Sequence, residues 1–287
     1  MRITDSHLHF WRIGGPGQTW PDAQWPILYR DFGPSDLLQA LSGASATVTS
    51  AGSTVEAVVL VQSQPDDRDT DWLLELATDL PLVAAVVGWV DLASTSAPAR
   101  IAKLAWHTKL RGLRPMLQAI EETEWLLRPE LEPALQAMVA AGLRFDALIQ
   151  PRHLPMLRAF AARWPDLPIV IDHGAKPRIA QGELDPWRAE IAALSRFPQV
   201  HCKLSGLRTE QAAGAPRAEL QPYMLHLLNT FQDRLMWGSD WPVLLHSQDQ
   251  YADWLNTSLE VAASAAGTVT AESLFRTAAT RFYGLGC

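Results

Sequence analysis

The sequence has few cysteines and no long apolar run. Only two of its 287 residues are cysteines, Cys202 within an apolar stretch and Cys287 at the end. Two thiols exclude a disulfide framework and a thiolate metal cluster, so any metal must be bound by His, Asp or Glu. No segment reaches the roughly 18 consecutive apolar residues of a membrane span. Because no apolar signal-peptide run follows Met1, we expect a soluble, cytoplasmic protein without a membrane partner.

Basic charge is also scarce in this chain. It has 24 Lys and Arg residues against 31 Asp and Glu residues, and the formal net charge is −7. Nucleic-acid binding depends on a concentrated basic face, so the composition argues against a nucleic-acid partner. Hydrophobic residues make up 48% of the chain, which is enough for a large core. We find no repeat, low-complexity tract or linker, and therefore predict one domain over residues 1–287.

Short apolar, β-branched stretches alternate with helical patterns along the chain. This alternation is typical of βα units around a parallel sheet, and eight units predict a single closed (β/α)8 TIM barrel. An open doubly wound sheet is the alternative, but no Gly-x-Gly-x-x-Gly motif follows the first strand. The predicted strands cover residues 2–9, 55–62, 82–91, 110–114, 144–150, 168–173, 199–205 and 234–240. The predicted helices include residues 70–80, 98–106, 131–141, 154–164, 186–197 and 222–231.

Residues 11–35 are rich in Gly, Pro and Trp and are too long for an ordinary βα connection. We expect this segment to lie over the site as a cover. In a (β/α)8 barrel the active-site groups come from the C-terminal ends of the strands, so the last polar residue of each strand is informative. Those residues are His7 and His9, Gln62, Asp91, Arg111 and Arg114, Gln150 and nearby His153, Asp172 and His173, Lys203 and Ser205, and Asp240.

Polar strand ends that merely meet solvent are the alternative explanation for many of these residues. The subset His7, His9, His173 and Asp240 is harder to explain in that way. In an extended strand alternate side chains share a face, so Asp5, His7 and His9 are expected to project in the same direction. Two imidazoles at that spacing suit a shared metal ion or a substrate oxygen.

Five segments carry recognisable motifs. They are residues 5–11 (Asp-Ser-His-Leu-His-Phe-Trp), 110–114 (Leu-Arg-Gly-Leu-Arg), 171–177 (Ile-Asp-His-Gly-Ala-Lys-Pro), 203–207 (Lys-Leu-Ser-Gly-Leu) and 237–242 (Trp-Gly-Ser-Asp-Trp-Pro). Together, in this order, they resemble the amidohydrolase superfamily. More narrowly, they resemble its amidohydrolase-2 branch, which contains sugar lactonases, 2-pyrone-4,6-dicarboxylate lactonase and 4-sulfomuconolactone hydrolase. The resemblance spans nearly the whole chain.

The resemblance implies a metal site formed by His7, His9, His173 and Asp240. Gln150 stands at a strand end where a histidine ligand is often found, and no lysine or glutamate suited to bridging two metals ends the fourth strand. We therefore expect one zinc-like divalent ion rather than two. Members of this branch also work without a metal, so a metal-free site remains the alternative.

Lactone hydrolysis needs an activated water, a polarised carbonyl and a proton for the leaving alkoxide. Asp240 is the expected general base, with His173 as a second catalytic residue. A bound ion would polarise the carbonyl and lower the pKa of water from about 16 toward 7. Arg111 and Arg114 are candidates for clamping a substrate carboxylate or hydroxyl. At i and i+3 of a straight strand they face opposite sides, so one of them is expected to form an ion pair toward the helices instead.

Four further residues are predicted to contact the substrate. Gln62 and Gln150 end strands, whereas His153 either contacts the substrate or packs at a helix start. Trp241 either stacks on a sugar ring or fills the core. The leading function is hydrolysis of a small sugar-acid or carboxylated lactone. A non-oxidative decarboxylase or hydratase of the same superfamily is the first alternative, and a catalytically silent metabolite-binding barrel is the second.

Overall fold

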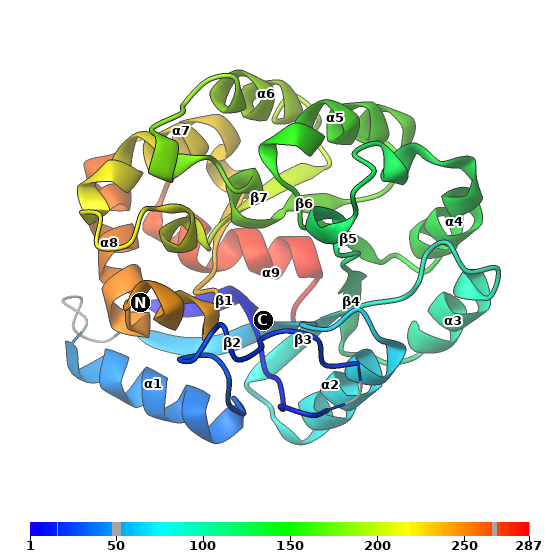
Figure 1. Ribbon diagram of the computed structural model, residues 1–287, viewed down its shortest axis with the longest axis horizontal. Helices are drawn as coiled ribbons and strands as arrows, with labels where there is room; N and C mark the ends of the chain where they lie inside the picture. Colours follow the sequence, from blue (N-terminus) through cyan, green and yellow to red (C-terminus); the bar gives the residue numbers. More distant parts are fainter. Residues whose placement is uncertain (16, 48–52, 266–268, 287) are drawn as a thin grey trace.

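Eight parallel strands follow one another in sequence order around a nearly closed barrel, with helices outside it, in the computed structural model (Figure 1). The structure describes residues 1–15, 17–47, 53–265 and 269–286. The strands are β1 (Arg2–Leu8), β2 (Thr54–Val61), β3 (Val83–Gly88), β4 (Leu110–Leu113), β5 (Arg144–Ala147), β6 (Ile169–Ile171), β7 (Val200–Leu204) and β8 (Leu235–Trp237). The expected TIM-barrel fold class is therefore confirmed.

The helices of the described residues follow the strands in the expected alternation. They are α1 (Pro34–Thr47), α2 (Asp67–Asp79), α3 (Ala97–Leu104), α4 (Glu132–Ala140), α5 (Leu154–Arg163), α6 (Trp187–Leu194), α7 (Gln221–Phe231), α8 (Tyr251–Ser264) and α9 (Ala278–Tyr283). None of these described helices has the length and apolar character required to cross a membrane.

Alternate side chains of the strands pack into two separate clusters. Val58 and Leu60 of β2 belong to the large cluster formed with the surrounding helices. Val59 and Val61 pack instead with Phe282 of α9 in a smaller cluster inside the ring of strands, where Figure 1 shows α9 in red. The Nε of Arg144, the first residue of β5, donates to the Phe282 carbonyl at 2.6 Å. Helix α9 therefore plugs the N-terminal end of the barrel, and the opposite mouth is left for the site.

The barrel closes between its first and last strands through the residues that follow them. The backbone N–H of Asp240 donates to the carbonyl of His7 at 2.8 Å, and that of His9 donates to the carbonyl of Trp241 at 2.8 Å. Leu8 and Trp241 form an isolated parallel bridge there. The two ends of the sheet, more than 230 residues apart in sequence, are therefore joined at the mouth.

Several predicted elements needed correction. The predicted strands over residues 82–91, 144–150 and 234–240 were too long, because the backbone leaves the sheet after Gly88, Ala147 and Trp237. The sequence analysis did not identify α1, α8 or α9. In α1 the run of Ser42, Gly43 and following small residues weakens the helical signal, since Gly and Ser are poor helix formers.

Removal of a buried side chain from α9, the helix that plugs the barrel floor, is predicted to cause a large loss of stability. Phe282 is 4% exposed, so Phe282→Ala should lower the free energy of unfolding by roughly 3–5 kcal/mol, because it removes a buried ring and leaves a cavity. Urea denaturation followed by circular dichroism measures this difference. Trp106→Ala is the matched control: Trp106 is 89% exposed, and its loss should change stability by less than about 0.5 kcal/mol. Equal effects of the two substitutions would contradict the plug assignment.

Candidate active site at the barrel mouth

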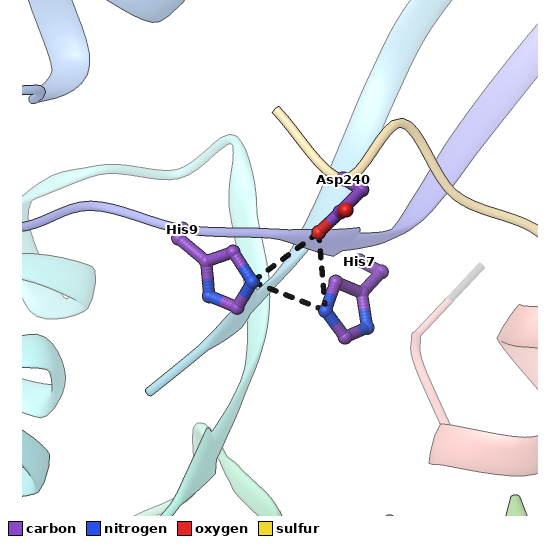
Figure 2. A group of neighbouring side chains, drawn as sticks. All are labelled: His7, His9 and Asp240. Carbon is purple, nitrogen blue, oxygen red and sulfur yellow. Dashed lines mark hydrogen bonds and ion pairs between the residues drawn. The ribbon is translucent and has the colours of Figure 1, made fainter. Parts of the chain in front are cut away.

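Three buried side chains converge where β1 and β8 end. The Nε2 atoms of His7 and His9 lie 3.2 Å apart. Asp240 Oδ1 lies 3.7 Å from His7 Nε2 and 3.5 Å from His9 Nε2. Figure 2 shows the two rings and the carboxylate facing one another. One ligand atom from each residue lies within 4.8 Å of the other two, so a single metal ion could contact all three.

His173 comes to the same point from the end of β6. Its ring centroid lies 4.5 Å from that of His7, and its Nε2 lies 3.8 Å from Asp240 Oδ1. Its Nδ1 is 2.8 Å from Ser205 Oγ, which fixes the ring plane. Gly206 leaves room for this ring, because a Cβ at that position would lie 2.4 Å from His173 Nδ1. The structure thus brings together the four residues that the sequence singled out.

The backbone at residues 173–176 is left-handed throughout. The φ angles are 55° at His173, 56° at Gly174, 62° at Ala175 and 52° at Lys176. Residues other than glycine rarely adopt this conformation, and each costs roughly 1–2 kcal/mol. A hydrogen bond of 2.9 Å from Lys176 N–H to the His173 carbonyl closes the turn, and Trp187 Nε1 donates to the Gly174 carbonyl at 2.7 Å. The surrounding contacts therefore hold a strained turn at the site, as is common at functional positions.

Beneath His7 lies a buried charged network that the sequence analysis did not assign to the site. Lys203 Nζ lies 2.6 Å from Asp146 Oδ2, 3.0 Å from Asp172 Oδ1 and 3.1 Å from His7 Nδ1. Tyr283 at the end of α9 donates to Asp146 Oδ2 at 2.6 Å. The signal for this network was present in the sequence, since Lys203 and Asp146 are charged residues inside strands, each with apolar residues on both sides.

The electrostatic surroundings keep the imidazoles of His7 and His173 neutral and the Asp240 carboxylate ionised. Burial and the charge of Lys203 lower the pKa of His7 well below its usual range. Burial also lowers the pKa of His173 to about 4. Burial alone would raise the pKa of Asp240, but the nearby His173 and the hydrogen bond with His9 lower it below its usual range. Neutral imidazole and ionised carboxylate are the forms that bind a metal ion.

Asp5 does not join this group, contrary to the expected alternation. Its Oδ1 accepts from the backbone N–H groups of Ser239 at 2.8 Å and His7 at 3.1 Å, and its Oδ2 accepts from Tyr251 OH at 2.8 Å. The pairing of β1 with β2 is irregular between Asp5 and Leu8, which breaks the alternation of the two faces. Burial raises the pKa of Asp5 to about 6. Asp5 therefore holds the loop before Asp240 rather than facing the mouth.

A cavity of about 320 Å³ opens above these residues. Its polar lining includes His9, His173, Asp240 and Arg114, whereas Met116, Leu148 and Val243 contribute apolar surface. Thr19 and Trp20 of the 11–35 segment also line it. Gln64 binds this segment through two hydrogen bonds, accepting from the Thr19 N–H at 3.0 Å and donating to the Trp20 carbonyl at 2.6 Å. The segment thus forms one wall of the cavity.

Arg111, within β4, and Arg114, directly after β4, occupy different places. Arg114 is buried, lines the cavity, and places NH1 3.5 Å from Asp172 Oδ2. Gln62 supports it by donating to the Arg114 carbonyl at 2.8 Å. Arg111 does not line the cavity. Burial lowers the pKa of the Arg144 guanidinium at the start of β5, and the nearby charge of Arg111 lowers it further. Arg111 therefore does not reach this cavity, because it lies lower on the barrel wall.

Gln62 and three other predicted contact residues are also not part of the lining of this cavity. Gln150 and His153 cap the turn before α5, where His153 Nδ1 accepts from the Gln150 N–H at 3.1 Å. The Trp241 ring packs edge-on against Phe10 and Phe32, with ring centroids 6.2 and 5.5 Å away. It borders a separate cavity of about 450 Å³ next to α1 and α8. Helix capping and core packing, the alternatives considered for His153 and Trp241, are what the structure shows.

Comparison with known proteins places this architecture in a family. A family model described as amidohydrolase matches residues 4–285. An L-fucono-1,5-lactonase of Burkholderia ambifaria is 48% identical over 254 residues, covering 88% of this chain and 84% of the relative. An L-fucono-1,5-lactonase of Burkholderia multivorans is 37% identical, covering 93% and 91%.

Solved structures agree with the family match. A crystal structure of an amidohydrolase from Burkholderia multivorans with bound zinc is 32% identical, covers the whole of both chains and superimposes with a TM-score of 0.87. A crystal structure of an amidohydrolase from the same organism with bound HEPES is 31% identical, with a TM-score of 0.88. The motifs, the barrel and these matches together show that the chain belongs to the amidohydrolase family, in its amidohydrolase-2 branch.

Proposed function

We propose that this chain hydrolyses a sugar-acid lactone, and that L-fucono-1,5-lactone is the substrate to test first. The observation that carries the proposal is the buried group of His7, His9 and Asp240 at the bottom of the cavity, in a chain whose relatives are L-fucono-1,5-lactonases. The chain is a lactonase of the amidohydrolase family. The decarboxylase and the silent barrel have no comparable support from the relatives named above.

The donor set fits one divalent metal ion. His9 Nδ1 lies 2.8 Å from the Val61 carbonyl, so its proton belongs there and its Nε2 is available as a ligand. His7 Nδ1 faces Asp172 Oδ1 at 3.4 Å and Lys203 Nζ at 3.1 Å, and a carboxylate near the far ring nitrogen accompanies a ligating histidine in many metal sites. Two neutral imidazoles and a carboxylate are ligands that Zn²⁺ prefers. We propose that His7, His9 and Asp240 hold the ion, with His173 beside them.

When bound, such an ion would polarise the lactone carbonyl and acidify water. Asp240 is ionised and lines the cavity, so it can take a proton from the attacking water as general base. His173 lies beside Asp240 and keeps its ring fixed through Ser205. The buried Arg114 offers guanidinium N–H groups to substrate oxygen atoms at the same cavity wall.

A substrate panel tests the proposed activity directly. Aldono-1,5- and 1,4-lactones, with L-fucono-1,5-lactone among them, are incubated with the purified protein, and acid release is followed with a pH indicator. We expect turnover well above spontaneous opening for at least one sugar-acid lactone. No acceleration of any lactone in the panel by the metal-loaded protein would contradict the proposed function.

Asp240→Asn is predicted to be the most damaging substitution at the mouth. It keeps the shape of the side chain but removes the basic lone pair, so kcat should fall by roughly 10²- to 10⁴-fold. Steady-state kinetics on the lactone measure this, with metal content determined in parallel to separate loss of the base from loss of the ion. Near wild-type turnover by a fully loaded Asn variant would show that Asp240 is not the base.

The two arginines are predicted to respond differently. Arg114→Met should raise KM for the lactone about tenfold or more, because Arg114 lines the cavity and a charge-assisted hydrogen bond contributes about 1.5–3 kcal/mol. Arg111→Met is the matched control and should leave KM nearly unchanged. A reversed order of the two effects would return the substrate contact to Arg111.

Metal content is predicted to be one ion per chain. The residues expected to bridge a second ion are absent from the ends of β4 and β5, so elemental analysis should find one equivalent of a zinc-like ion. Chelation should abolish turnover, and Zn²⁺ should restore it. Two equivalents would refute a mononuclear site, whereas full activity without metal would establish the metal-free alternative.

A further inference from the structure

Two neutral polar groups in the lining of the cavity have no hydrogen-bond partner in the described part of the chain. They are the side-chain amide of Gln118 and the indole N–H of Trp20. Both side chains are half-buried, and neither group is sealed off from open space. Of the lining hydroxyls, those of Ser63 and Thr209 are hydrogen-bonded to other residues, and Thr19 is exposed to solvent. A few polar groups of this kind usually fix the orientation of a bound molecule.

The two cations of the lining already face carboxylates. Arg114 NH1 lies 3.5 Å from Asp172 Oδ2, and Lys176 Nζ lies 3.3 Å from Glu210 Oε1. A negatively charged group on a substrate would be repelled by these carboxylates, whereas a hydroxyl group brings no charge. The lining therefore favours an uncharged, hydroxylated ring over a ring that carries a carboxylate.

Gln118 is held in place by its backbone. It is the middle residue of η1 (Leu117–Ala119), a short 3-10 helix that follows β4. Its N–H donates to the carbonyl of Leu148, the residue after β5, at 3.0 Å. The amide of a glutamine carries one acceptor oxygen and two N–H donors. It can therefore bond to two neighbouring hydroxyl groups of a sugar ring.

Trp20 is held by Gln64 and by other rings of the covering segment. Gln64 Nε2 donates to the Trp20 carbonyl at 2.6 Å, and the Trp20 ring meets those of Trp11 and Trp25 edge to face, with centroids 5.3 and 5.9 Å away. The indole N–H of Trp11 donates to the Arg30 carbonyl at 2.8 Å, whereas that of Trp20 bonds to no described residue. An indole N–H is a donor only, so it suits the oxygen of a hydroxyl group.

We propose that Gln118 and Trp20 set the specificity of this site by hydrogen-bonding the ring hydroxyls of an uncharged sugar lactone. The inference rests on the proposed lactonase function and adds the class of lactone, a hydroxylated ring without a carboxylate. A site built around substrate hydroxyls discriminates against a ring that lacks them, because its own polar groups are then left unpaired. Neither residue takes part in bond breaking; both hold the ring while water attacks.

Two variants and two lactones test the hydroxyl contacts. Gln118→Leu and Trp20→Phe keep an apolar or aromatic side chain but remove the N–H donors. On L-fucono-1,5-lactone each variant should lower kcat/KM by roughly 3- to 10-fold, the worth of one neutral hydrogen bond, mainly through KM. On δ-valerolactone, a six-membered lactone without hydroxyls, kcat/KM should be unchanged. If the wild-type protein does not open δ-valerolactone, its inhibition constant against L-fucono-1,5-lactone is compared instead.

Gln136→Leu is the matched control for the glutamine variant. Gln136 is exposed on α4 and is not part of the cavity lining, so its loss should leave kcat/KM for both lactones unchanged. Thermal unfolding and metal content confirm that all variants are folded and loaded.

A second pair of lactones tests the preference for an uncharged ring. D-Glucono-1,4-lactone and D-glucaro-1,4-lactone share their ring stereochemistry, but the second carries a carboxylate in place of a CH₂OH group. The wild-type protein should open the first with the higher kcat/KM, or bind it more tightly as an inhibitor if it opens neither. The reverse order would show that the site selects a charged lactone and would overturn the inference.

The remaining outcomes separate the specificity assignment from the proposed function. Equal losses on L-fucono-1,5-lactone and δ-valerolactone would overturn the inference, because they would indicate a structural role. Wild-type kcat/KM in both variants would overturn it as well, and a selective loss in only one variant would remove the other residue from the assignment. A wild-type protein that opens no lactone would instead defeat the proposed function itself.

Discussion

Two backbone hydrogen bonds between the ends of the sheet hold the active site together. They join the Asp240 N–H to the His7 carbonyl and the His9 N–H to the Trp241 carbonyl. Both histidines and the aspartate are fixed by the same pair of bonds, so the closed barrel and the candidate site depend on the same contacts. Asp5 reinforces this junction by accepting from the Ser239 N–H and from Tyr251 OH.

The charges inside the barrel are tolerable because they are paired. A buried lysine without partners would be strongly destabilising, but Lys203 lies between Asp146 and Asp172 and also faces His7. Tyr283 bonds to Asp146 from the plug at the opposite end. The network therefore links the helix that fills the barrel floor to a histidine of the mouth. It also holds Asp172 near His7 Nδ1, so it serves packing and the orientation of the His7 ring together.

Backbone strain and polar side chains meet in the lining of the cavity. The left-handed turn carries His173 and Lys176, and the polar groups of Arg114 and Asp240 lie with them in the lining. Trp20 of the covering segment, with Met116 and Leu148, forms the apolar remainder. The cavity therefore offers both polar and apolar surface to a small molecule.

The amino-acid sequence by itself determined the barrel, the order of its strands and the four residues His7, His9, His173 and Asp240. These are visible in sequence because strand periodicity and polar strand ends are local patterns. The helix α9 was missed because its role is to fill a space that exists only once the barrel is closed. The tertiary structure alone decided that Arg114 rather than Arg111 reaches the cavity and that Trp241 packs in the core. It also alone placed Lys203 and Lys176, because burial, bulges and left-handed turns depend on contacts between residues far apart in the chain.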